Sequence, residues 1–77
     1  MRPEGKKETM KRTAKDFYAS QELFSKHREK NYTDAPCVCF YQAYSFDSGV
    51  LVEKWSLNGK IVLVEIFPDG NGFRVNQ

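Results

Sequence analysis

The sequence lacks most of the features that mark enzymes, disulfide-rich proteins and membrane proteins. Its 77 residues include only two cysteines and one histidine, too few for a multi-disulfide scaffold or a histidine-based catalytic group. The longest apolar run, residues 61–64, is strand-sized, whereas a membrane span needs roughly 18–20 apolar residues and a signal peptide a continuous apolar segment. The expected location is therefore the reducing cytoplasm. A chain of this length predicts one domain.

The residues that can carry chemistry do not form a complete site. Cys37 and Cys39 lie two apart, and adding His27 gives three zinc ligands where a structural site needs four. Free cysteines pack as small hydrophobic residues, and a histidine at a basic helix end is typical of a solvated position that complements the helix dipole. Glu53 and Glu65 are the nearest candidates for a carboxylate pair, but the strand register described below puts them on opposite faces. We therefore expect no enzyme, no metal and no cofactor.

Positive charge is concentrated in the N-terminal part of the chain. The formal net charge is only +2, but residues 1–31 carry nine Lys or Arg against five acids, and residues 32–77 carry three against five. Clustered cations contact phosphates, so nucleic-acid binding is the alternative functional hypothesis. The competing interpretation is a solvated helix face with acid–base pairs at i,i+4 spacing. The candidate residues are Lys6, Lys7, Lys11, Arg12 and Lys15.

The N-terminal part of the chain predicts a basic arm followed by one helix. Residues 1–9 are polar and include proline and glycine, so we expect a flexible arm, with residues 10–77 forming the domain. From Met10 to Lys30 there is no glycine or proline, and Met10, Phe17 and Phe24 recur every seven residues on one face. Thr9 or Thr13 can cap the helix, and Asp16 gives Thr13 a capping-box partner. The expected helix ends near Asn31, before Pro36.

The remainder predicts an antiparallel β-meander. Residues rich in Val, Ile, Tyr, Phe and Trp form three strand patterns, at 37–46, 50–57 and 60–67, and residues 73–76 can add a short edge strand. Asn58-Gly59 predicts a two-residue type I′ hairpin, which pairs Leu57 with Lys60 and Glu53 with Val64. The expected fold class is α+β, one N-terminal helix packed on a three- to four-stranded antiparallel meander sheet.

The first hairpin has two possible registers. A two-residue loop at Ser48-Gly49 puts the bulky, even-numbered residues of the first strand on the face of Leu51 and Trp55. A three-residue loop at 47–49 puts them instead on the face of Val50 and Val52, because a slip of one residue exchanges the faces. The sequence alone leaves this choice open.

Either register leaves more apolar surface than one helix can cover. A sheet with two apolar faces and one helix exposes the second face, and such a patch usually marks an interaction site. We therefore predict a non-catalytic protein that binds another protein, or itself as a homodimer, through the face or edge of its sheet. By size alone it is comparable to phage and mobile-element accessory factors that inhibit host machinery, such as anti-CRISPR proteins. The candidate partner-binding residues are Phe40, Tyr41, Tyr44, Phe46 and Trp55.

Overall fold

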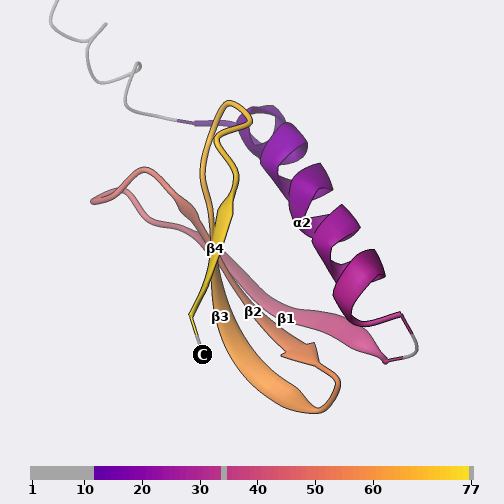
Figure 1. Ribbon diagram of the computed structural model, residues 1–77. Coiled ribbons are helices and arrows are strands. Elements are labelled where there is room, and N and C mark those ends of the chain that lie inside the picture. The colour runs from indigo at the N-terminus through magenta and orange to yellow at the C-terminus, as the bar shows by residue number, and fades with distance from the viewer. Residues whose placement is uncertain (1–11, 34, 77) are drawn as a thin grey trace, which may run out of the picture.

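In the described part of the chain, one helical segment lies along one side of a four-stranded antiparallel sheet with the strand order β1-β2-β3-β4 (Figure 1). The computed structural model describes residues 12–33 and 35–76. The predicted α+β class is therefore confirmed, with the short fourth strand present. The expected flexible arm and Met10 lie outside the described residues.

The helical segment begins with a 3₁₀ turn, η1 (Ala14–Phe17), and continues as α2 (Tyr18–Asn31). Thr13 precedes η1, and its backbone N–H donates to Asp16 Oδ2 at 3.0 Å, as the capping-box prediction requires. Phe17 and Phe24 are buried, so the predicted apolar face is confirmed for these two positions. At the other end, the Tyr32 N–H donates to the Arg28 carbonyl at 2.8 Å, which makes Tyr32 the C-cap, one residue beyond Asn31.

Three loops, at residues 45–50, 58–59 and 67–72, connect the strands β1 (Cys37–Tyr44), β2 (Leu51–Leu57), β3 (Lys60–Ile66) and β4 (Phe73–Asn76). Asn58 and Gly59 have φ angles of 56° and 82°, which is the left-handed conformation that a type I′ turn demands at both positions. Leu57 pairs with Lys60 and Glu53 with Val64. The register predicted from Asn58-Gly59 is confirmed along the whole β2–β3 ladder.

The first hairpin differs from both predicted alternatives. The Ser45 N–H donates to the Val50 carbonyl at 2.9 Å, and the Gly49 N–H donates to the Ser45 carbonyl at 2.8 Å. Four residues, 46–49, therefore form the loop, which is longer than either the two or the three expected. Gly49 has a φ of 75°, so glycine provides the left-handed residue that returns the chain to β2.

The core lies between the helix and the adjacent sheet face. The Phe24 ring centroid is 5.3 Å from that of Trp55 and 5.0 Å from that of Phe73, so one helical side chain contacts both β2 and β4. The buried apolar residues of this core are Phe17, Phe24, Leu57, Val62, Val64 and Ile66. No described element lies on the opposite side of the sheet (Figure 1), which we call the open face.

Candidate protein-binding surface

A β-bulge in β1 decides which side chains reach the open face. Cys39 pairs with Trp55 and Tyr41 pairs with Lys54, so Phe40 is an extra residue with no partner of its own on β2. A bulge breaks the strict alternation of side chains between faces. Residues before and after Phe40 therefore follow opposite alternation, and the continuous bulky face expected for the first strand does not exist.

Before the bulge, the odd-numbered residues face the helix. Cys37 pairs with Leu57, which is 2% exposed in the core, whereas Val38 pairs with Ser56 on the open face. After the bulge, the even-numbered residues face the helix, because Gln42 pairs with the buried Glu53.

Large apolar side chains are exposed on the open face and at the bulge. Val38 and Tyr41 are 55% and 46% exposed, and Ile61 on β3 is 60% exposed. Val38, Ser56 and Ile61 form one cross-strand row, and Phe40 is 52% exposed in the bulge. We call these four exposed residues the apolar patch: Val38, Phe40, Tyr41 and Ile61.

One positive charge borders the apolar patch. The Lys54 Nζ lies 4.8 Å from the centroid of the Tyr41 ring, a distance at which an ammonium group is attracted to an aromatic face. Farther across the open face, Glu65 Oε1 lies 3.8 Å from Arg74 Nε. The open face therefore carries charged side chains near the apolar patch that can form polar contacts with a partner at the rim of an interface.

The structure separates the five predicted partner-binding residues. Phe40 and Tyr41 belong to the apolar patch. Tyr44 and Trp55 face the helix, with the Tyr44 ring 6.1 Å from that of Phe17 and Trp55 against Phe24. Phe46 is 73% exposed in the loop between β1 and β2, with its ring 4.8 Å from that of Tyr44. The predicted set therefore does not form one surface.

A part-buried polar cluster around Glu53, beneath the helix, was not predicted from the sequence. Glu53 is 3% exposed, and its Oε2 accepts hydrogen bonds from Gln42 Nε2 at 2.8 Å and Gln21 Nε2 at 3.1 Å. Its Oε1 accepts from the Trp55 indole N–H at 2.7 Å. Each of the three polar residues Gln21, Gln42 and Glu53 interrupts an otherwise apolar face, on the helix, the first strand and the second strand respectively. These three interruptions were the sequence signal that could have predicted the cluster. The cluster joins α2, β1 and β2.

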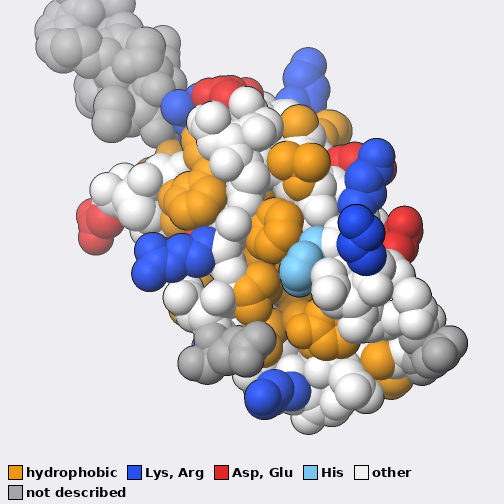
Figure 2. Space-filling model, viewed as in Figure 1, with side chains coloured by type: hydrophobic (Ala, Val, Ile, Leu, Met, Phe, Trp, Pro, Cys, Tyr) orange, Lys and Arg blue, Asp and Glu red, His pale blue; other side chains and the backbone are white. Residues whose placement is uncertain are grey.

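The residues weighed for metal or thiol chemistry remain dispersed. His27 is half-buried rather than solvated, with its ring 5.2 Å from Phe73 and 6.1 Å from Phe24; Figure 2 shows it in pale blue among apolar side chains. Partial burial raises the pKa of the Cys39 thiol, and the Glu53 carboxylate acts in the same direction. Among the described residues, no group of three or more His, Cys, Asp or Glu is placed to hold a metal ion.

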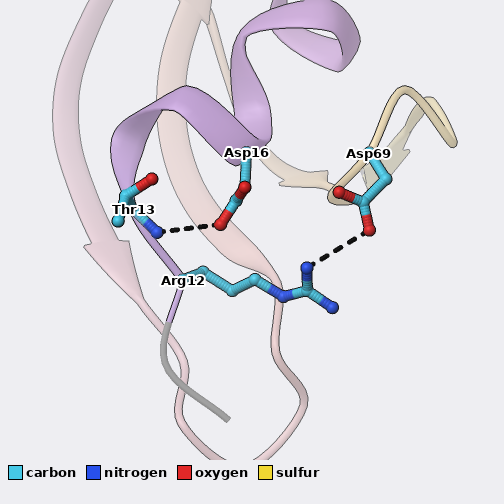
Figure 3. Close-up of polar contacts among 4 residues, drawn as sticks. All are labelled: Arg12, Thr13, Asp16 and Asp69. Carbon is cyan, nitrogen blue, oxygen red and sulfur yellow. Dashed lines mark hydrogen bonds and ion pairs between the residues drawn. The ribbon is translucent and has the colours of Figure 1, made fainter. Parts of the chain in front are cut away.

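Two of the five predicted nucleic-acid-binding residues lie within the described part of the chain. Arg12 Nη1 lies 3.2 Å from Asp69 Oδ2, which ties the start of the helical segment to the turn after β3 (Figure 3). Lys15 is exposed on η1. Lys6, Lys7 and Lys11 lie outside the described residues. The structure therefore gives Arg12 an intramolecular partner and leaves the rest of the proposed basic site untested.

A concave region lies where the loop at 46–49 meets the turn after β3. Its volume is about 670 Å³, and its lining includes Phe46, Phe67 and both Arg12 and Arg74. Each arginine already lies near a carboxylate, Arg12 near Asp69 and Arg74 near Glu65. Opposite charges thus offset one another around this hollow, and it offers a weaker basis for a functional site than the apolar patch does.

No protein-family model matches the sequence, and comparisons with curated proteins and with solved structures found no significant match. Among the described residues, no helix is long and apolar enough to cross a bilayer.

Proposed function

We propose that this protein is non-catalytic and works by binding another protein chain through the apolar patch on and beside β1. The observation that carries the proposal is the position of Val38, Tyr41 and Ile61, each about half exposed or more on a sheet face that no described element covers. Isolated exposed apolar residues are ordinary, but a group of them on one face usually marks an interaction site.

The size of the patch fits the centre of a protein interface. A fully accessible aromatic side chain offers roughly 150–250 Å² and an aliphatic one somewhat less, so the two aromatic and two aliphatic side chains of the patch, each about half exposed, present about 300–400 Å². That area is on the order of half of the ~800 Å² that each partner contributes to a standard interface. At ~25 cal/mol per Å², its burial is worth about 8–10 kcal/mol before the costs of association are subtracted. This gain is comparable to the ~4–15 kcal/mol that association costs, so the patch needs further contacts from its surroundings to give stable binding.

The location of this binding is proposed to be the cytoplasm. Both cysteines are free thiols, which is the usual state of cysteine in a reducing compartment. The comparison with phage-encoded inhibitors of host machinery rests on size alone and stays a hypothesis about the class of partner. Identification of a captured partner would test it directly.

The proposal can be tested by comparing what matched variants capture from a native lysate. We expect Tyr41→Ser/Ile61→Ser to lose the proteins that the wild-type chain retains, because both substitutions make the patch polar. The matched control is Tyr18→Ser/Leu23→Ser, which removes two side chains exposed to 60% and 44% on the helix. Equal retention by both double variants would overturn the proposal.

A further inference from the structure

The outer edge of β1 carries few of the features that normally prevent a sheet edge from pairing. β1 is an end strand of the sheet, and its sequence from Cys37 to Tyr44 contains no charged residue and no proline. Natural edge strands are usually short, charged or interrupted by proline, because an unpaired edge invites another strand. The opposite edge, β4, follows this rule, since it has four residues and carries Arg74. The bulge is the one protective feature of this kind in β1.

The bulge leaves two outward-facing backbone positions in a symmetric arrangement. Hydrogen-bonding direction alternates along an antiparallel strand. Since the Ser45 N–H bonds to β2, the backbone of Gln42 faces away from β2. On the other side of Phe40, the Asn58-Gly59 hairpin directs the backbone N–H and C=O of Leu57 toward β3, and therefore those of Ser56 toward β1. Val38 pairs with Ser56, so its backbone groups point toward β2 and those of the next residue, Cys39, point outward. Cys39 and Gln42 therefore flank the bulge with their N–H and C=O groups directed to the edge.

We propose that a second copy of this chain occupies this edge, with the two β1 strands antiparallel about a two-fold axis. In this register, Cys39 of each copy lies opposite Gln42 of the other. Because both pairs, Cys39 with Gln42 and Gln42 with Cys39, form at once, the two-fold axis passes between residues 40 and 41. The two bulges therefore face each other, and Phe40 lies beside Tyr41 of the second copy. The two sheets then continue as one. This inference rests on the proposed function and names the occupant of the part of the apolar patch that belongs to β1.

Charge and the distribution of the patch favour a second copy as that occupant. An uncharged strand that pairs with itself opposes no like charges, which would otherwise disfavour the symmetric arrangement. Three of the four patch residues, Val38, Phe40 and Tyr41, belong to β1 rather than to the centre of the sheet. Pairing at this edge brings the exposed aromatic rings of the two copies together, and cross-strand aromatic pairs stabilise a sheet.

Sedimentation velocity of the full chain, measured over a range of concentrations, tests the inference. We expect the wild type to dimerise reversibly, and Phe40→Lys and Phe40→Glu each to raise the dimer dissociation constant at least about tenfold. The reason is that the two introduced like charges lie close together beside the two-fold axis and repel each other. An equimolar mixture of the two variants should recover the dimer, because the charges are then opposite. Circular dichroism and Trp55 fluorescence verify that each variant is folded.

Tyr18→Lys is the matched control, because Tyr18 is also an exposed aromatic residue, at 60% against 52% for Phe40, but lies on α2 and outside the apolar patch. Edge pairing predicts a change of less than about twofold for this variant. An equal loss of dimer with Tyr18→Lys, or no recovery in the mixture, would overturn edge pairing. A wild type that stays monomeric at every concentration would also overturn it. The proposed function would still stand if that monomer captures another protein that Tyr41→Ser/Ile61→Ser loses.

Discussion

Replacing Glu53 with leucine tests how strongly the buried polar cluster stabilises the fold. Leucine keeps much of the side-chain volume but removes the acceptor of three hydrogen bonds, those from Trp55, Gln42 and Gln21. The two amides lie close enough to solvent to rotate toward water, so each loses about 0.5–1.5 kcal/mol. The indole N–H can only donate, and leaving it unpaired beneath the helix costs roughly 1–3 kcal/mol.

These losses are partly offset by the apolar surface that leucine buries. We expect Glu53→Leu to lower the free energy of unfolding by about 2–4 kcal/mol. A chain of this length has a total stability of about 4–12 kcal/mol, so the variant should remain folded at low urea concentration and unfold at a clearly lower midpoint. Urea titration followed by far-ultraviolet circular dichroism measures the difference.

Two further variants separate the hydrogen bonds from a general effect of substitution. Glu53→Gln should cost less than about 1 kcal/mol, because the amides of Gln21 and Gln42 can flip and offer their carbonyl oxygens to the new amide. Trp55→Phe should cost less in the Glu53→Leu background than in the wild type, by about 1–3 kcal/mol. A coupling energy below about 0.5 kcal/mol would refute the assignment of the Trp55 bond as a stabilising contact.

Three other outcomes follow from the geometry. Deleting Phe40 should leave the fold intact within about 1 kcal/mol, because Cys39 and Tyr41 keep their β2 partners and only the extra residue is lost; loss of the cooperative thermal transition would contradict this. The raised pKa of Cys39 means less thiolate at neutral pH, so iodoacetamide should modify it more slowly than a free cysteine, and the rate should keep rising at more alkaline pH. Comparison with Cys39→Ser isolates the reaction of Cys39 from that of Cys37, and a rate faster than that of free cysteine would contradict the raised pKa. Nucleic-acid binding, if it occurs, should weaken steeply with salt and with Lys11→Glu/Arg12→Glu; affinity for single-stranded or duplex probes that is indifferent to both would eliminate the alternative function.

The parts of the fold set by local rules were predictable from the sequence. Asn58-Gly59 specifies its turn through two residues with positive φ, and the register of β2 and β3 follows from that turn by counting. Phe17 and Phe24 recur at helical spacing, so their burial against the sheet was predictable as well. In both cases a short stretch of chain contains the whole physical cause.

The surface could not be predicted because its cause is not local. Phe40 carries no sequence mark that distinguishes a bulge from a regular strand position, and the four-residue loop at 46–49 resembled a shorter turn because Asp47, Ser48 and Gly49 are all typical turn residues. The four-residue loop puts Gln42 and Tyr44 on the face that a two-residue loop also predicts, because a shift of two residues preserves the faces, whereas the bulge exchanges the faces of the residues before Phe40. The result is visible in the pairing of Gln42 with Glu53 on one side of the bulge and of Cys37 with Leu57 on the other.

The polar cluster and the apolar patch both depend on how the side chains of β1 alternate at the bulge. After the bulge, alternation places Gln42 toward the helix, where its amide reaches Glu53 at 2.8 Å, and Tyr41 toward the open face. With regular alternation continued from Cys39, the bulky ring of Tyr41 would lie on the helix side and Gln42 would lie on the open face. The buried carboxylate would then lose one of its three donors, and the open face one of its aromatic rings. The polar cluster therefore fixes the alternation of β1, and through it fixes which aromatic residues remain exposed for binding.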